Sequence, residues 1–163
     1  MTTAIAQFMR QLERAWDAHN TALLQRDVAA ALTQLATRSS IRHIPALTGA
    51  DDRADVARFY AQDVVPHLPA DLAITRISRT VDRFRLVDEA TVSFTHNCEL
   101  PWLLPGIAPT HRPAEVLAIA VVGFDHGRIA TQRILWDHAT LIAQLGVTKF
   151  PDGPGTGWSG GGC

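Results

Sequence analysis

The sequence predicts an α+β domain in which helices cover one face of a sheet. Three observations support this fold class: helical spacing dominates residues 4–37, strand alternation dominates 72–136, and helical spacing returns over 139–145. With 163 residues, the chain is long enough to bury a substantial core. We expect a single domain over 1–150, followed by a flexible glycine-rich C-terminal tail over 151–163.

The predicted helices follow from apolar residues three and four positions apart. The first helix carries an apolar stripe made of Ile5, Phe8, Met9, Leu12, Ala15, Trp16 and His19. Asp27 is predicted to cap a shorter helix over 28–35. A turn and cap at 48–52 precede a third helix, whose apolar face carries Val56, Phe59, Tyr60 and Val64.

The strands are predicted from alternating, β-branched segments. Residues 39–45 predict a short edge strand that ends at Pro45. Five longer strands are expected, over 72–81, 83–87, 91–100, 115–124 and 128–136. Asp88-Glu89 and Asp125-His126-Gly127 are the expected turns between neighbouring strands. Gly146 is expected to stop the terminal helix.

Composition excludes several classes of function. Fifteen basic and sixteen acidic residues give a net charge of −1, so nothing favours nucleic acid as a partner. No apolar run is long enough to span a membrane and no signal peptide is recognisable, which predicts a soluble cytoplasmic protein. The cysteines Cys98 and Cys163 are therefore expected to be reduced. Abundant Arg and Ala with a single lysine, Lys149, are typical of a GC-rich bacterial source.

The sequence lacks the common cofactor, metal and nucleophile motifs. No dinucleotide or phosphate loop and no nucleophile elbow is present, so no cofactor is expected. No His or Cys pair has zinc-ligand spacing, so no metal is expected either. Acid–base chemistry by side chains alone remains as the candidate chemistry.

Asp137 lies where the last strand ends and the terminal helix begins. A carboxylate at this position either caps the helix or stands at the mouth of a cavity with a raised pKa. In the second case it would serve as a general acid or base. Both interpretations remain open from the sequence.

His96 is the candidate partner of Asp137. It shares one face of its strand with Val92, Phe94 and Cys98, so its imidazole is expected to point inward, either as a satisfied core histidine or as a catalytic group. The candidate pocket residues are His43, Phe59, Tyr60, Phe94 and Trp102.

Several short stretches resemble a known family. They are Phe94-Thr95-His96, Leu104-Pro105-Gly106 with Pro109-Thr110, Trp136-Asp137 with Ala139, and Gln144-Leu145-Gly146. With the order of the elements, they resemble the SnoaL-like, polyketide-cyclase-like branch of the nuclear transport factor 2-like superfamily over about residues 5–150.

The resemblance implies a cone: a strongly curved antiparallel sheet wrapped around the N-terminal helices, with an internal apolar pocket and a homodimer formed through the outer face of the sheet. It further implies an Asp general acid/base near the end of the last strand, where Asp137 stands. Relatives of this fold include isomerases, dehydratases and epoxide hydrolases with an Asp-Arg-Asp arrangement. Arg133 shares a face with Asp137, but no second Asp accompanies them.

Two functions follow as hypotheses. The first is a cofactor-independent cyclase, isomerase or dehydratase that acts on an apolar, oxygenated small molecule, with Asp137 transferring a proton and His96 binding an oxygen. The second is a non-catalytic small-molecule-binding or dimerisation module with the same cavity.

Overall fold

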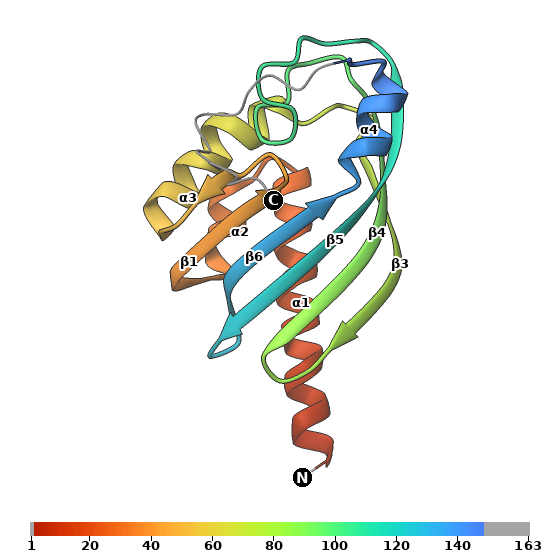
Figure 1. The fold of residues 1–163 in the computed structure, drawn as a ribbon. Helices are drawn as coiled ribbons and strands as arrows, with labels where there is room; N and C mark the ends of the chain where they lie inside the picture. Colours follow the sequence, from red (N-terminus) through yellow and green to blue (C-terminus); the bar gives the residue numbers. More distant parts are fainter. Residues whose placement is uncertain (1, 149–163) are drawn as a thin grey trace, which may run out of the picture.

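The computed structural model describes residues 2–148 and confirms the α+β class (Figure 1). The predicted tail, 151–163, and Cys163 lie outside the described residues. The elements are α1 (Thr2–Leu24), α2 (Val28–Thr33), β1 (Leu35–Ile44), β2 (Thr48–Ala50), α3 (Arg53–Phe59), the π-helical η1 (Tyr60–Val64), the 3-10 turn η2 (Val65–His67), β3 (Ala73–Val81), β4 (Arg85–Thr95), β5 (Pro113–Asp125), β6 (Arg128–Trp136) and α4 (His138–Leu145).

The six strands form one curved sheet in the order β2-β1-β6-β5-β4-β3 (Figure 1). Every neighbouring pair is antiparallel except β1 and β6, which run parallel, so the sheet is mixed. The long helix α1 lies across one face and contacts β3 and β6. Inward side chains of the strands alternate with outward ones, as the burial pattern of β5 shows most clearly. The core therefore lies between α1 and the concave face of the sheet.

Three helices begin at an aspartate whose side chain accepts a hydrogen bond from a backbone N–H three residues later. Asp27 caps α2, Asp52 caps α3 and Asp137 caps α4. Such a cap satisfies one of the N–H groups that the first helical turn leaves free. At the other end of α4, Gly146 adopts a left-handed conformation and stops the helix, as predicted.

The hairpin between β5 and β6 confirms the predicted turn. His126 and Gly127 both have positive φ, the combination that tight two-residue hairpins require. The turn fixes the β5–β6 register, in which Ala120 pairs with Ile134 and Ala118 with Trp136. This register places inward residues of β5 and β6 side by side.

The prediction of a short edge strand over 39–45 is wrong. The strand β1 begins at Leu35 and pairs on one side with β2 and on the other with β6, so it lies inside the sheet. Pro45 follows the last residue of β1, where its missing N–H costs no ladder hydrogen bond. The interior position buries His43.

The prediction of two strands separated by a turn at Asp88-Glu89 is also wrong. Residues 85–95 form the single strand β4, and the chain turns earlier, where the carboxylate of Asp82 accepts hydrogen bonds from the N–H groups of Phe84 and Arg85 at 2.6 and 2.8 Å. An aspartate that bonds to the backbone two residues later is a strong turn former. As a result, Asp88 lies within a strand instead of at its tip.

No helix within residues 2–148 is both long and apolar enough to cross a membrane. Cys98 forms no disulfide within the same residues and is partly buried.

Candidate functional site

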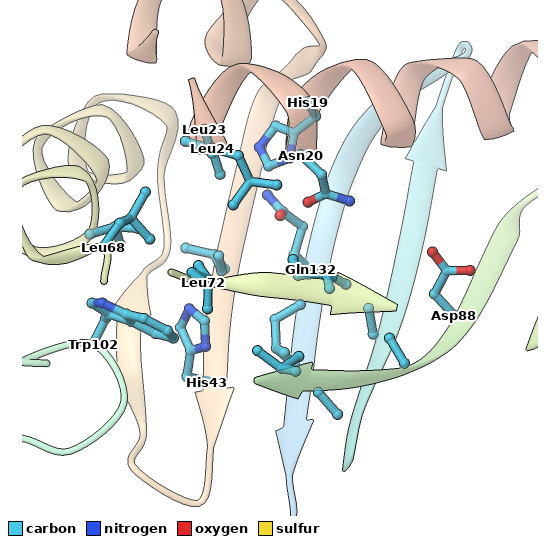
Figure 2. Close-up of a pocket in the computed structure, with 18 of the residues that line it drawn as sticks. His19, Asn20, Leu23, Leu24, His43, Leu68, Leu72, Asp88, Trp102 and Gln132 are labelled. Carbon is cyan, nitrogen blue, oxygen red and sulfur yellow. The ribbon is translucent and has the colours of Figure 1, made fainter. Parts of the chain in front are cut away.

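An apolar cavity of about 160 Å³ lies between α1 and the concave face of the sheet. Its polar lining residues are Trp16, His19, Asn20, His43, Tyr60, Asp88, Trp102, Gln132 and Trp136. In Figure 2, His19 and Asn20 reach from α1 toward the sheet, His43 and Trp102 stand at one end, and Asp88 stands at the other. A cavity of about this volume holds a benzene-sized ring. The enclosed part therefore accommodates one ring or a short branched chain.

Aliphatic side chains line part of the cavity, and two of them reach the surface at its opening. They are Leu23, Leu24, Leu68, Leu72 and Ile74, of which Leu24 and Ile74 are exposed by 43% and 48%. Exposed aliphatic residues at an opening let an apolar molecule enter without desolvating charged groups. The mouth thus favours an apolar ligand that extends outward from the enclosed end.

The enclosed end is aromatic. The imidazole of His43 packs 5.4 Å from the ring of Trp102 and 6.1 Å from that of Trp136, with Phe59 behind it at 6.0 Å. The Nε1–H of Trp136 donates to Nδ1 of His43 at 3.1 Å. Burial lowers the pKa of His43 to about 3, so the ring is neutral at ordinary pH. With Nδ1 accepting, the proton is on Nε2, which is left as a donor.

The middle of the cavity holds a tyrosine hydroxyl between two polar partners. The hydroxyl of Tyr60 lies 3.0 Å from Nε2 of His19 and accepts from Nε2 of Gln132 at 2.9 Å. Burial raises the pKa of Tyr60 well above its ordinary value, while burial lowers that of His19 to about 4, the side chain of Asn20 opposing the lowering. Tyr60 therefore stays protonated and His19 stays neutral.

The far end of the cavity carries a carboxylate. Asp88 accepts from Nε and Nη2 of Arg79, each at 2.6 Å, and from Nε1 of Trp16 at 2.9 Å. The side chains of Asp88 and Arg79 are only 13% and 9% exposed. Arg79 also pairs with the half-exposed Asp17 at 2.7 Å, and its hydrogen bonds to Asp88 raise its pKa. Two charge-assisted bonds in parallel hold Asp88 in one orientation.

The structure does not place the predicted pair, Asp137 and His96, at this cavity. Asp137 is exposed and caps α4, accepting from the N–H and the hydroxyl of Thr140 at 3.1 and 2.6 Å. These hydrogen bonds hold the pKa of Asp137 below its ordinary value, which is the direction that a helix cap gives and not the direction that a desolvating cavity would give. Asp137 does not line the cavity. Of the two interpretations of this residue, the helix cap is the one that the geometry shows.

His96 is fully buried, as its position on the apolar strand face predicts, but it lies outside the cavity lining. Its Nδ1 lies 3.1 Å from the hydroxyl of Thr110 and 3.3 Å from the Thr110 N–H, which fixes the loop over residues 96–112. Burial lowers the pKa of His96, and the nearby His111 acts in the same direction.

Three of the five predicted pocket residues line the cavity: His43, Tyr60 and Trp102. Phe59 and Phe94 do not. Phe59 packs behind His43, and Phe94 is a buried core residue of β4.

Asp88, Gln132 and His19 line the cavity but were not among the pocket residues predicted from the sequence. Gln132 was detectable, because alternation along β6 places it on the same face as Ile134 and Trp136. His19 was visible only as a polar member of an apolar helical stripe. The sequence pattern did not indicate that Asp88 faces the cavity, because Asp88 was predicted to lie in a turn between two strands.

Among residues 2–148, no group of three or more His, Cys, Asp or Glu side chains is arranged to hold a metal ion.

No family model matches the chain, and no curated protein matches it. Similar solved structures include a provisionally assigned SnoaL-like polyketide cyclase from Shewanella denitrificans, with a TM-score of 0.67, 15% identity, and coverage of 83% of this chain and 96% of that one. A nuclear transport factor 2-like protein of unknown function from Burkholderia pseudomallei has a TM-score of 0.64 and 18% sequence identity, and the match covers 83% of this chain and 97% of that one. A limonene-epoxide-hydrolase-like epoxide hydrolase from Mycobacterium tuberculosis has a TM-score of 0.63 and 14% sequence identity, and the match covers 84% of this chain and 90% of that one.

These likenesses define the fold class: the chain has the cone fold shared by nuclear transport factor 2-like proteins, SnoaL-like polyketide cyclases and ketosteroid-isomerase-like proteins. At identities of 13–18% they establish architecture and leave the reaction open.

Proposed function

We propose that this protein binds an apolar small molecule carrying a carbonyl or hydroxyl oxygen and transfers a proton on it, as a cofactor-independent isomerase, cyclase or dehydratase. The observation that carries this proposal is the placement of one carboxylate, Asp88, and one tyrosine hydroxyl, Tyr60, on the wall of the same apolar cavity. Low polarity around such a pair strengthens both hydrogen bonding and charge stabilisation.

The two groups have complementary roles in this proposal. Asp88 bonds to Trp16 and Tyr60 bonds to His19, and the rings of Trp16 and His19 are stacked with centroids 5.5 Å apart. A small ketone can lie along this stack. Asp88 would remove a proton from the carbon next to the carbonyl, and the enolate oxygen would accept a hydrogen bond from Tyr60. Return of the same proton to a different carbon would complete an isomerisation.

Neighbouring groups support the role of Tyr60. Gln132 donates to the phenolic oxygen, so the phenolic proton points either to Nε2 of His19 or, when that nitrogen is itself protonated, to a ligand. The Nε2–H of His43 offers a second oxygen-binding donor at the enclosed end. Asp88, Tyr60 and His43 replace Asp137 and His96 as the residues proposed to act on the ligand.

A non-catalytic binding module is the second candidate. It is favoured by one observation: both carboxylate oxygens of Asp88 already accept hydrogen bonds from Arg79 and Trp16. A carboxylate held in this way can serve as a fixed part of the wall without accepting a proton from the ligand.

Deuterium exchange distinguishes the two candidates. Small cyclic ketones are incubated with the protein in D2O, exchange at the carbon next to the carbonyl is followed by NMR, and binding is measured separately by quenching of the cavity tryptophans. The proposal predicts protein-dependent exchange that Asp88→Asn abolishes while binding persists. Binding without exchange would identify a binding module.

We further infer a homodimer formed through the outer face of the sheet. Leu117 and Leu135 are exposed by 38% and 40% on this face, and the register places Leu135 beside Ile119. An apolar stripe of this kind is typical of a contact between protein surfaces. Sedimentation of the chain as a dimer, and of Leu117→Glu as a monomer, is the expected result; a monomeric wild-type chain would refute the inference.

A further inference from the structure

The outer face of the sheet also carries a basic hollow, on the opposite side of the strands from the cavity. Its outward residues come from four neighbouring strands and the turn after β2. They are Ser40 and Arg42 of β1, Thr131 and Arg133 of β6, Val121 and Gly123 of β5, Arg85 of β4, and Asp51. Three arginines against one aspartate leave a net charge of +2 around this hollow.

The arginines are placed close together by strand register. Arg42 and Arg133 are directly paired on the parallel strands β1 and β6, which lie about 4.8 Å apart. Like charges directly opposite each other are unfavourable. Arg42 is paired with Asp51 and also donates to the carbonyl of Leu47. The guanidinium groups of Arg85 and Arg133 have no hydrogen-bonded or directly paired partner within residues 2–148, although Arg85 interacts electrostatically with Asp82 at longer range. Their N–H donors are therefore left for a ligand.

The floor of the hollow is formed by Gly123 and by the Thr131 hydroxyl, which packs against it. A Cβ atom at Gly123 would lie 2.4 Å from Oγ1 of Thr131, so the threonine hydroxyl covers the position that a larger residue would occupy. Gly123 pairs with Arg85 on one side and with Thr131 on the other, and the β5–β6 register shifts directly after it. The absence of a side chain at Gly123 therefore leaves room for the Thr131 hydroxyl at the floor of the hollow.

We propose that this hollow binds a tetrahedral oxyanion of the phosphate type, either free or as the terminal group of a small metabolite. Arg85 and Arg133 approach from strands on either side of Gly123, and the hydroxyl of Thr131 adds a neutral donor. Guanidinium groups bind phosphate oxygens through two parallel N–H bonds, which makes arginine better suited to this task than lysine. A bound oxyanion also offsets the repulsion between Arg42 and Arg133.

The test measures binding of inorganic phosphate by isothermal titration calorimetry at constant ionic strength, with chloride as the background anion. Saturable binding is expected, with sulfate competing. Arg85→Gln and Arg133→Gln should each weaken the affinity about tenfold, the effect of losing one charge-assisted contact. Gly123→Ala should weaken it by displacing the Thr131 hydroxyl, which lies 2.4 Å from the position of the added Cβ atom. Glycerol phosphate binding as tightly as phosphate would identify a terminal phosphate group; weaker binding would identify the free ion.

Arg83→Gln is the matched control, because it removes the same charge from an exposed residue on the turn before β4. Its affinity for phosphate should equal that of the wild-type chain, and all variants should show the wild-type circular dichroism spectrum. The proposal is overturned if neither phosphate nor sulfate binds saturably, or if Arg83→Gln weakens binding as much as Arg133→Gln. It is also overturned if Arg133→Gln dissociates a dimer that phosphate does not affect, since the arginines then serve a contact between copies.

Discussion

Two aspartates show how different the cavity wall and the strand–helix junction are. Asp137, at the junction, finds its partner three residues away in the sequence and remains exposed. Asp88, on the wall, is held by Trp16, 72 residues away, and by Arg79 across a strand pair. A local hydrogen bond shapes the end of one helix, whereas the long-range bonds of Asp88 join α1, β3 and β4 into one wall. The candidate chemistry belongs to the region that only tertiary structure assembles.

The largest expected difference between the two regions is in the pH dependence of stability. Burial lowers the pKa of His43 to about 3 and that of His19 to about 4, both below the 6.5 of an exposed histidine. Between the folded-state pKa of each histidine and the unfolded-state value of 6.5, the unfolded chain binds more protons than the folded chain. The contribution of each neutral buried histidine to the free energy of unfolding is therefore complete above pH 6.5 and decreases as the pH falls. From about pH 7 to about pH 5 each histidine should cost about 2 kcal/mol of unfolding free energy.

Urea unfolding across this pH range measures the effect. His43→Gln should reduce the slope by the contribution of one buried histidine, whereas His126→Gln should leave it unchanged, because the side chain of His126 is 95% exposed. An equal slope in all three proteins would show that the cavity histidines are not buried as neutral rings.

Removing Arg79 is the next largest change. Arg79→Gln leaves Asp88, only 13% exposed, with no cationic partner, and should destabilise the protein by about 2–4 kcal/mol in urea unfolding. Arg76→Gln is the matched control. Arg76 lies 3.8 Å from Asp17 and is 51% exposed, so its loss should cost less than about 0.5 kcal/mol. Similar costs for the two variants would contradict a wall held together by the Arg79–Asp88 pair.

Removing the hydroxyl of Tyr60 tests the middle of the cavity. Tyr60→Phe leaves polar nitrogens of His19 and Gln132 buried without this partner, and should cost about 1–3 kcal/mol of unfolding free energy. Adding Gln132→Leu to Tyr60→Phe should recover part of that loss, since an unpaired amide is removed with its partner. No recovery in the double variant would mean that the cost comes from packing and not from unsatisfied polar groups.

Local signals predicted local features well. Asp27 as a helix cap, the turn at Gly127 and the end of α4 at Gly146 each depend on a few adjacent residues, and all are found as predicted. The site was harder to predict because its members come from separate elements. The acidic pair Asp88-Glu89 looked like a turn, and only the backbone hydrogen bonds accepted by Asp82 and the partners of Asp88 show otherwise. His96 was correctly placed inside, but β4 ends at Thr95, before His96 and before the predicted end of this strand at residue 100, and the His96 ring contacts Thr110 and not the cavity.

The smallest expected effect concerns Asp137. Asp137→Ala should lower the free energy of unfolding slightly through loss of the α4 cap, as Asp27→Ala should through loss of the α2 cap, and Asp137→Asn should change it little because asparagine also caps helices well. If the reacting groups line the cavity, Asp137→Asn keeps the ketone exchange that Asp88→Asn removes. The reverse pattern, with exchange lost in Asp137→Asn and kept in Asp88→Asn, would return the proton-transfer role to the junction. Measuring both variants in one NMR assay thus decides which aspartate acts, since neither substitution changes the size of the side chain.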